Sequence, residues 1–393
     1  MLGAVLEGSE ISLYVHVPFC AHKCEYCAFY SHAPGDLLQR YTHALVREAQ
    51  MLPKFSPRTI FFGGGTPSLL TLKQWEQIGE VFRELGWTKA EEWSVECNPA
   101  TVSREKAELF RAIGVSRVSM GVQSFDRDLL ERLGRIHSRE QVSKSYEVLR
   151  NVFQNINIDL MFGIPTQTME VWKATLKEAL ALETKHLSCY EVIYEQDTPL
   201  YAQLQAGEFD VDEELACAMY EELVSTTARA GFVQYEIANF AKDEHGGDQT
   251  QVPSYACKHN VNYWRGGFYY ALGPSAAGYE PSEGSVGIRT RNWANTQMYC
   301  EVVEKGQRPL ESREELSAIA RAGEVAAFGL RMNAGWPFES FRRATGFDLR
   351  TEWRGEMEKL ATDGLAMVEE ERFRLNERGL RLADFAAREF LRS

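Results

Sequence analysis

Three cysteines near the start of the chain have the types and the spacing to bind a metal centre. Cys20, Cys24 and Cys27 follow the pattern C-x3-C-x2-C. Three thiolates on one short loop can hold three corners of a [4Fe–4S] cluster and leave the fourth iron without a protein ligand, whereas a fourth cysteine closes an electron-transfer cluster. An open iron suits S-adenosylmethionine (SAM), because its amino and carboxylate groups chelate that iron, and one electron then yields an adenosyl radical.

Zinc is the alternative for the same cysteines. This ion prefers four ligands, and His16, His22 or His32 could supply the fourth. A loop of inert thiols is a further alternative. The spacing by itself therefore leaves iron–sulfur and zinc open.

A run of glycines follows the expected strand at 59–62. Gly63, Gly64 and Gly65 stand before Thr66, and glycines at the carboxyl end of a barrel strand let a ligand approach the backbone. A tight strand-to-helix turn would explain the same residues. The run does not fit the dinucleotide pattern G-x-G-x-x-G, which argues against a Rossmann fold.

Three polar side chains, Glu96, Gln123 and Asp159, lie at or near the ends of further expected strands. A fourth, Arg135, stands in the segment Leu133-Gly-Arg-Ile-His137. Polar side chains at this end of a barrel strand usually face the site, and an arginine can pair with a carboxylate through two hydrogen bonds. Each residue could instead have a purely structural role, such as capping a helix or lying on a solvated face. Taken together, they favour a binding site.

Strand-like and helix-like segments alternate over the first 200 residues and would position these groups. The expected strands are Ile11–Val17, Thr59–Phe62, Glu92–Glu96, Ser116–Gly121, Asn155–Leu160 and His186–Glu191. The expected helices are Leu37–Met51, Leu72–Leu85, Arg104–Ile113, Arg139–Phe153 and Met169–Leu182. This order predicts an α/β fold with a parallel sheet. Six strands fit a partial (β/α)6 TIM-like barrel as well as a doubly wound sheet.

The alternation of strand-like and helix-like segments ends after residue 231. The stretch Phe232–Phe240 reads as one further strand, and a polar loop and an aromatic, glycine-rich stretch follow it. The last segment, Glu356–Phe390, has the helix–strand–strand–helix order of a small winged-helix-like α+β unit. We therefore expect a barrel at 1–235, a connecting region at 236–305 and a C-terminal unit at 306–393.

Composition narrows the class of protein. The chain has 393 residues and a formal net charge of −13, which disfavours binding to nucleic acid or to an anionic membrane. It contains no apolar run that could span a bilayer, and its first ten residues lack the basic start of a signal peptide. A cytoplasmic location follows, in which the eight cysteines are not expected to form disulfides.

The motifs resemble those of the radical SAM superfamily, in the branch that contains oxygen-independent coproporphyrinogen III dehydrogenase. The matching segments are YVHVPFC, FFGGGTPSLL, GVQSF, NIDLMFGIP and the late GPSA at 273–276, and the resemblance runs from about Leu13 to the C-terminus. It implies a [4Fe–4S] cluster on the three cysteines and an aromatic residue, Tyr26, beside it. It also implies that the contacts to one or two SAM molecules come from Tyr14, Gly64, Gly65, Thr66, Glu96, Gln123, Arg135 and Asp159.

Two departures point away from the dehydrogenase. That enzyme has an extension before the cluster and another cysteine two residues after the last ligand, whereas here the cluster begins at Cys20 and the corresponding position is Phe29. Both features match the haem chaperones of the same branch. The segment His259-Asn-Val-Asn-Tyr263-Trp264 also matches the H-N-x-x-Y-W motif associated with haem binding in those chaperones.

The resemblance predicts a protein that binds haem, with His259 as iron ligand and Tyr263 and Trp264 beside it, and that delivers haem to acceptor proteins such as respiratory cytochromes. Imidazole is a common axial ligand of haem, although a single histidine more often packs inside a fold. An electron donor protein is a further expected partner. Oxidative decarboxylation of coproporphyrinogen and radical methylation of haem are alternatives. Whether SAM is cleaved, how many SAM molecules bind and which oligomer forms stay open.

Overall fold

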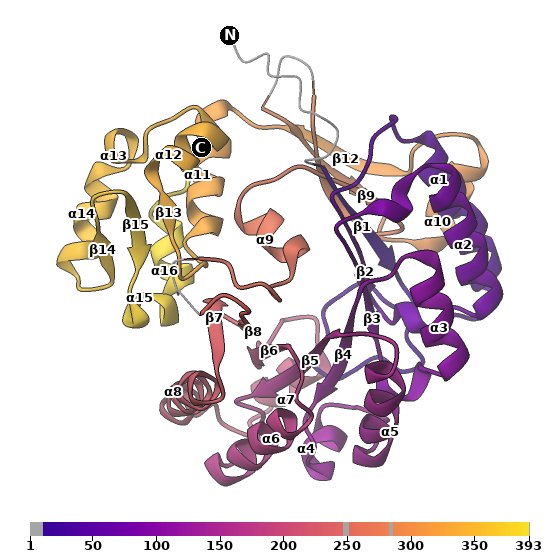
Figure 1. Cartoon of the computed structure of the whole chain (residues 1–393), viewed down its shortest axis with the longest axis horizontal. Helices are drawn as coiled ribbons and strands as arrows, with labels where there is room; N and C mark the ends of the chain where they lie inside the picture. Colours follow the sequence, from indigo (N-terminus) through magenta and orange to yellow (C-terminus); the bar gives the residue numbers. More distant parts are fainter. Residues whose placement is uncertain (1–10, 247–250, 283–285, 393) are drawn as a thin grey trace.

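The structure is a computed structural model that describes residues 11–246, 251–282 and 286–392. Residues 1–10, which carry the expectation about a signal peptide, lie outside this part. A curved sheet occupies the centre of the molecule, and the C-terminal unit lies beside its open side (Figure 1). Among the described helices, none has both the length and the apolar character needed to cross a lipid bilayer.

Six parallel strands form the middle of the sheet and pair in sequence order, which confirms the expected partial barrel. The strands are β1 (Ser12–Val17), β2 (Thr59–Gly64), β3 (Glu92–Cys97), β4 (Arg117–Gln123), β5 (Asn155–Phe162) and β6 (His186–Glu191). The helices that follow them are α1 (Leu37–Met51), α2 (Leu72–Glu84), α3 (Arg104–Ile113), α4 (Arg127–Arg132), α5 (Arg139–Arg150), α6 (Met169–Ala181), α7 (Pro199–Gln205) and α8 (Glu213–Arg229).

Most of these helices begin at side chains that cap their free backbone N–H groups. The Thr71 and Ser138 hydroxyls start α2 and α5 as capping boxes with glutamines three residues on. The Ser103 and Thr168 hydroxyls cap α3 and α6, each with a single hydrogen bond from a backbone N–H. Local sequence therefore fixes where these four crossover helices start.

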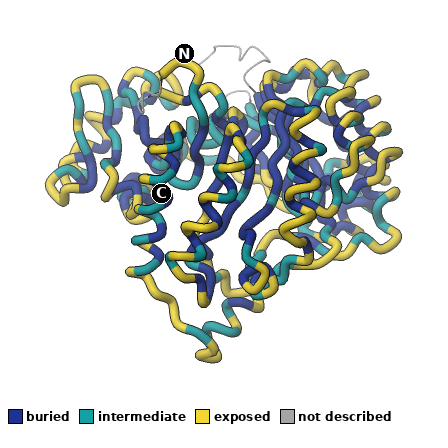
Figure 2. The backbone as a smooth tube through the Cα atoms, turned by 60° about the horizontal axis from the view of Figure 1, so that its bottom comes forward, coloured by how far each residue is buried: buried dark blue, intermediate teal, exposed yellow. Residues whose placement is uncertain are grey.

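The two faces of the parallel strands differ sharply in polarity. On the helix-covered face, alternate residues such as Leu13, Ile60 and Val118 are fully buried and apolar. The inner face carries polar residues at the intervening positions, including Ser94, Ser119 and Asn157, all of which are also buried. Figure 2 shows the strands as the darkest, most buried part of the chain and the outer helices as its exposed surface. The barrel thus has an apolar shell and a polar interior.

The sheet is longer than the sequence indicated, with twelve strands in the order β12-β11-β10-β9-β1-β2-β3-β4-β5-β6-β8-β7. The added strands are β7 (Phe232–Glu236), β8 (Asn239–Lys242), β9 (Tyr269–Leu272), β10 (Ala277–Glu280), β11 (Ile288–Asn292) and β12 (Leu310–Glu315). The single strand expected at 232–240 is wrong. The chain reverses near 237–238, and β7 and β8 pair as an antiparallel hairpin with a bulge.

The C-terminal unit has a separate apolar core around Trp336, Phe341 and Trp353. Its small sheet has the order β13-β15-β14, and a two-residue strand missed at the sequence level completes it. Its elements are α11 (Ala318–Gly329), β13 (Trp336–Pro337), α12 (Phe338–Thr345), α13 (Leu349–Glu352), α14 (Arg354–Thr362), β14 (Ala366–Val368), β15 (Arg372–Leu375), α15 (Glu377–Arg381) and α16 (Ala383–Arg388). The division of the chain at 235 and 305 stays a prediction.

Candidate functional site

The three predicted cluster cysteines lie on the loop after β1 and are half-buried free thiols. The loop is held by backbone hydrogen bonds, from Cys20 N to His32 O at 3.1 Å and from Glu25 N to Leu133 O at 3.1 Å. Two side chains reach the sulfur atoms. Thr66 Oγ1 lies 3.6 Å from Cys20 Sγ, and Arg135 Nη1 lies 3.6 Å from Cys24 Sγ.

Three cysteine thiols on one loop are a donor set that fits a [4Fe–4S] cluster. In the part of the chain that the structure describes, no three His, Cys, Asp or Glu side chains are gathered as they would be around one metal ion. The thiols are nevertheless close enough to interact, since burial raises the pKa of Cys27 and the charges of Cys24 and Cys20 raise it further. A [4Fe–4S] cluster binds each thiolate on a different iron, so its ligands stand further apart than those of zinc.

Packing against the first strand explains two of the three glycines after β2. A side chain at Gly64 would collide with the His16 ring, and Gly64 has a φ of +100°. A side chain at Gly65 would meet the carbonyl oxygens of Val17 and Phe19, both at 2.7 Å. The Gly65 and Thr66 amides donate to those same two oxygens. The glycine run therefore ties β2 to the cysteine loop.

Glu96 and Asp159 lie together on the polar inner face. Burial raises the pKa of Glu96 to about 8, the Asp159 charge adds to this effect, and the Gly64 amide opposes it. Asp159 accepts hydrogen bonds from Asn157 Nδ2 at 2.7 Å and from the Ser119 hydroxyl. Two half-buried carboxylates that repel each other would both be stabilised in their charged forms by a cationic ligand.

Gln123 and Arg135 converge at the end of β4. Gln123 has a φ of +67° at a bulge between β4 and β5, a strained backbone for a residue with a side chain. Arg135 donates to the Gly121 carbonyl at 2.5 Å, and its Nε is buried without a partner among the described residues. A side chain at Gly121 would meet both Gln123 Nε2 and Arg135 Nη2. An unused buried donor beside the cysteine loop is suited to a bound acceptor.

The two predicted aromatic residues of the cluster and SAM region occupy different places. Tyr26 packs with Leu133 and Met161 beside the cysteine loop. Tyr14 is on the inner face of β1, where its hydroxyl lies 3.0 Å from His16 Nδ1 and its ring stacks on Phe61. Burial raises the pKa of both phenols, so both stay protonated.

The predicted haem motif forms α9 (Lys258–Trp264), which lies between the strands and the C-terminal unit (Figure 1). His259 is fully buried, and both of its ring nitrogens are bonded: Nδ1 to Thr59 Oγ1 and Nε2 to the Tyr263 hydroxyl, each at 2.8 Å. Because the Thr59 hydroxyl donates to Ser12, Nδ1 carries the proton and Nε2 accepts from Tyr263. The His259 lone pair is therefore engaged within the fold in this conformation.

The end of the motif faces the C-terminal unit. Arg331 lies 5.0 Å from the Trp264 ring centre, and Phe328 packs against the same ring. Arg265 donates to the Gly335 carbonyl at 2.6 Å. Helix α9 thus contacts the barrel interior on one side and the C-terminal unit on the other. The structure therefore does not bring the Trp264 and His259 side chains together.

His16 is a site residue that sequence reasoning considered merely as a zinc ligand. Its ring lies against Gly64, and its nitrogens bond the Tyr14 hydroxyl and the Tyr30 carbonyl. A signal was present, because Tyr14, His16, Ser94 and Ser119 all occupy alternate positions that face the barrel interior. Successive residues of a strand face opposite sides of the sheet, so comparing the two alternating sets of residues in each strand would have predicted a polar interior.

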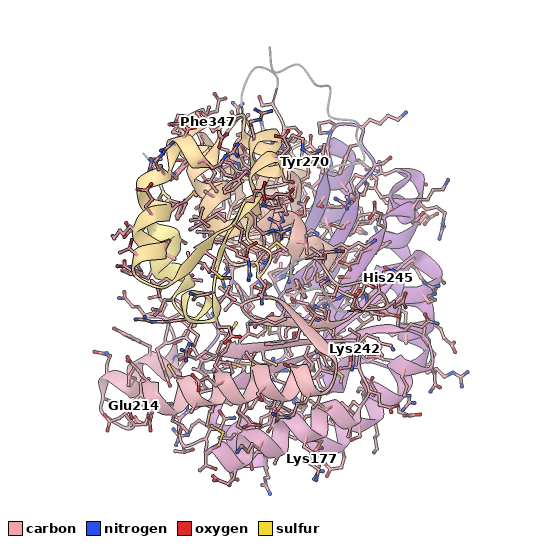
Figure 3. All side chains as sticks on the ribbon, turned by 60° about the vertical axis from the view of Figure 1, so that its left-hand side comes forward. Lys177, Glu214, Lys242, His245, Tyr270 and Phe347 are labelled. Atoms are coloured by element: carbon pink, nitrogen blue, oxygen red, sulfur yellow. The ribbon has the colours of Figure 1, made fainter. Side chains whose placement is uncertain are left out.

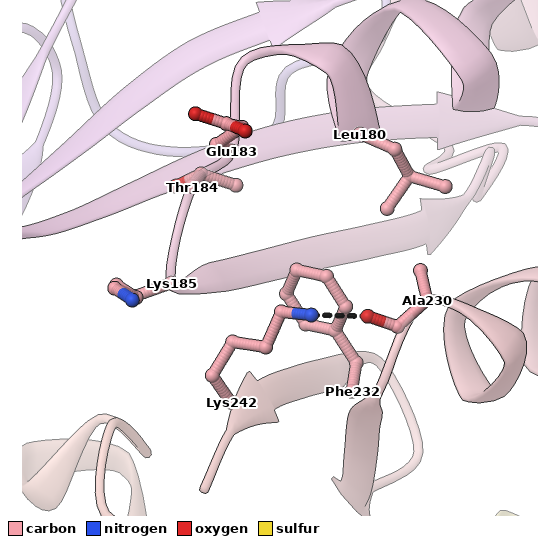
Figure 4. A pocket seen from close by; sticks show the side chains of 7 residues that line it. All are labelled: Leu180, Glu183, Thr184, Lys185, Ala230, Phe232 and Lys242. Atoms are coloured by element: carbon pink, nitrogen blue, oxygen red, sulfur yellow. Dashed lines mark hydrogen bonds between the residues drawn. The ribbon is translucent and has the colours of Figure 1, made fainter. Parts of the chain in front are cut away.

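A cavity of about 430 Å³ lies away from these groups, at the loops before β6 and β7. Figure 4 shows Lys242 in it donating to the Ala230 carbonyl. The Lys242 ammonium also lies 4.3 Å from the Phe232 ring centre. Its cation is thus held by the protein itself, and the cavity does not share a residue with the predicted site.

A partial barrel with three cysteines on the loop after its first strand is the arrangement of a radical SAM protein, and residues 14–179 match the model of the Radical SAM superfamily. Residues 316–382 match the HemN C-terminal domain. The fold is that of the Escherichia coli coproporphyrinogen III oxidase HemN, described as a radical SAM enzyme, with a TM-score of 0.81, 22% identity and coverage of 98% of this chain and 91% of that one.

Curated relatives extend over nearly the whole chain. "Heme chaperone HemW" of Bacillus subtilis is 33% identical, covering 94% of this chain and 96% of the relative. HemW of Escherichia coli is 30% identical over 86% of each chain. The mouse protein "Radical S-adenosyl methionine domain-containing protein 1, mitochondrial" is 32% identical, covering 96% and 86%. The chain belongs to the HemW family.

Proposed function

We propose that the protein is a haem chaperone, which binds haem and transfers it to apoproteins that need it. The observation that carries this proposal is the similarity to relatives named as haem chaperones along almost their entire length. Haem-requiring acceptors such as respiratory cytochromes, and an electron donor protein, would be its partners. We place this activity in the cytoplasm.

Cys20, Cys24 and Cys27 would hold a [4Fe–4S] cluster, and an exposed Phe29 stands where the dehydrogenase has a further cysteine. When bound at the cluster, SAM supplies radical chemistry. The residues of this chain would bind and orient it. Glu96 and Asp159 offer negative charge to a cation, and the free Nε of Arg135 offers a hydrogen bond to a carboxylate.

His259 would be the haem ligand, as the motif predicts, with Tyr263 beside it and Trp264 at the junction with the C-terminal unit. Its bonded, buried ring requires that α9 move before iron can reach Nε2. The arrangement resembles a closed state from which α9 opens toward haem. Binding is thereby coupled to the contacts that hold this helix in place.

Titration of ferric haem into anaerobically reconstituted protein tests this proposal. The wild type should bind haem with a spectrum of imidazole ligation, and His259→Ala should lose that spectrum. His43→Ala, which removes an exposed histidine, is the matched control. Unchanged stoichiometry and spectrum in His259→Ala would remove His259 as the ligand, and absence of haem binding in every variant would remove the function.

A further inference from the structure

A second cavity, of about 600 Å³, lies on the outer side of α9, a size within the usual range of ligand pockets. Helix α9 lines it with Lys258, Val261 and Asn262, and Arg265 follows directly after the helix. These positions are spaced i, i+3, i+4 and i+7, so they share one face of the helix. His259 and Tyr263 occupy the other face, and the cavity is therefore distinct from the His259 environment.

The charges of this cavity are unusual for the chain. Arg58, Lys258 and Arg265 line it, although the formal net charge of the protein is −13. Arg58 and Lys258 share one carboxylate, Glu91, at 3.4 and 3.2 Å. The acidic group on the cavity wall, Asp243, accepts hydrogen bonds from the Ser254 amide and hydroxyl. Among the described residues that line the cavity, three are therefore cations and one is a carboxylate.

Arg265 supplies an independent observation. Its guanidinium donates to the Gly335 carbonyl and lies 4.9 Å from the Trp336 ring centre. In residues 11–246, 251–282 and 286–392, no carboxylate forms an ion pair with it. Burial, together with the charge of Arg372, lowers its pKa to about 10. A largely buried cation without an anionic partner is costly, and an anionic ligand would supply the partner.

Part of the remaining wall is apolar, with Val252, Pro253, Ala256 and Val261, and the rest includes the polar side chains of His245, Ser254 and Asn262. Figure 3 shows His245, at the edge of this cavity, on the same side of the molecule as Lys242. Residues 247–250 lie outside the described part of the chain. A lining that combines apolar residues with three cations suits a ligand that has a hydrocarbon body and carboxylates.

We propose that this cavity binds the carboxylates of a porphyrin through Arg58, Lys258 and Arg265. The inference rests on the proposed haem-chaperone function, and it assigns a role to the outer face of α9. Recognition of the two propionates does not require iron, so the cavity would hold the porphyrin whether or not His259 reaches the metal. The apolar wall would cover part of the macrocycle.

Metal-free protoporphyrin tests this site separately from iron ligation. The variant Arg58→Gln/Lys258→Gln removes two exposed cations, and Lys54→Gln/Lys89→Gln removes two exposed lysines that do not line the cavity. We expect the first variant to bind protoporphyrin about tenfold more weakly than the wild type and the second to bind it equally well. Protoporphyrin dimethyl ester, which lacks the charges, should bind the wild type and both variants alike.

Equal protoporphyrin affinity in the wild type and Arg58→Gln/Lys258→Gln would overturn the inference. Equal affinity of the wild type for the diacid and its ester would do the same. Displacement of protoporphyrin by inorganic phosphate at equal concentration would show a general anion site and also contradict the assignment. If ferric haem still depends on His259 while the cavity variants bind normally, the cavity assignment fails and the chaperone function stands.

Discussion

Nε2 of His259 accepts a hydrogen bond from the hydroxyl of Tyr263, 2.8 Å away on the same face of α9. On the other side of the ring, Nδ1 is bonded to Thr59 at the start of β2. Burial lowers the pKa of His259 to about 3, so the ring is neutral at physiological pH, as an iron ligand must be. Burial therefore keeps the ring in the neutral form that can bind iron, whereas the hydrogen bond from Tyr263 blocks Nε2.

Removing the Tyr263 hydroxyl should release that block. Tyr263→Phe keeps the ring and leaves the Nε2 lone pair unpaired, so we expect haem to associate faster than with the wild type. Stopped-flow absorbance after mixing with ferric haem measures this rate. Tyr201→Phe, in α7, is a control for loss of a tyrosine hydroxyl elsewhere. Slower association in Tyr263→Phe would mean that the hydroxyl assists haem binding.

The cysteine loop gives a prediction about metal content. Cys20→Ser, Cys24→Ser and Cys27→Ser should each lose most of the iron and sulfide after anaerobic reconstitution, because these three thiolates are the whole protein ligand set of the proposed cluster. Cys217→Ser should keep both, since Cys217 is an exposed thiol in α8. Iron and sulfide assays with the brown absorption of the cluster provide the measurement. Zinc in place of iron in the wild type would contradict the cluster.

The strained backbone at Gln123 should be visible in stability. Gln123→Gly and Gln123→Ala both remove the side chain, but glycine alone adopts a φ of +67° without steric cost. We expect the glycine variant to be more stable than the alanine variant by about 1 kcal/mol in urea unfolding of the apoprotein. Equal stability would show that the bulge relaxes on substitution.

Glu48 in α1 predicts a pH dependence of stability. It is fully buried and accepts hydrogen bonds from the Gly273 amide, Asn292 and Tyr299, yet burial raises its pKa to about 7. A raised pKa means that the folded state holds a proton that the unfolded state releases above about pH 4.5. Its contribution is full below that pH and is lost as the pH rises to about 7, by about 3 kcal/mol.

Substitution of Glu48 isolates this effect. In Glu48→Gln the free energy of unfolding should fall less between pH 4.5 and 7.5 than in the wild type, as measured by urea unfolding. Glu84→Gln, at an exposed position at the end of α2, should leave the wild-type slope unchanged. A wild-type slope that persists in Glu48→Gln would show that Glu48 stays ionised throughout.

The barrel could be predicted from sequence because its signals are local. Strand β6 and helices α1 and α3 have the expected bounds, since alternation, caps and glycines mark their ends. The extension through β9 to β12 was missed because β9 is four residues long and pairs with β1, more than 250 residues earlier. Such pairing leaves no trace in the sequence near β9.

In the candidate site, too, local sequence features could be predicted and long-range contacts could not. The cysteine spacing and the strand-end residues Glu96 and Asp159 are visible in the sequence, and the structure places these two carboxylates close enough to interact. The surroundings of His259 were not predictable, because its partners Thr59 and Glu92 come from distant strands. A motif specifies which residues are present, whereas tertiary packing decides whether a lone pair is free.

The central claim is that the protein handles porphyrin without converting it. Reconstituted protein incubated anaerobically with SAM, a reductant and coproporphyrinogen III, and in parallel with haem and an apo-haemoprotein, tests it directly by chromatography of the tetrapyrroles. We predict unchanged coproporphyrinogen and intact haem in the acceptor. Formation of protoporphyrinogen would contradict the account and assign the protein to oxidative decarboxylation.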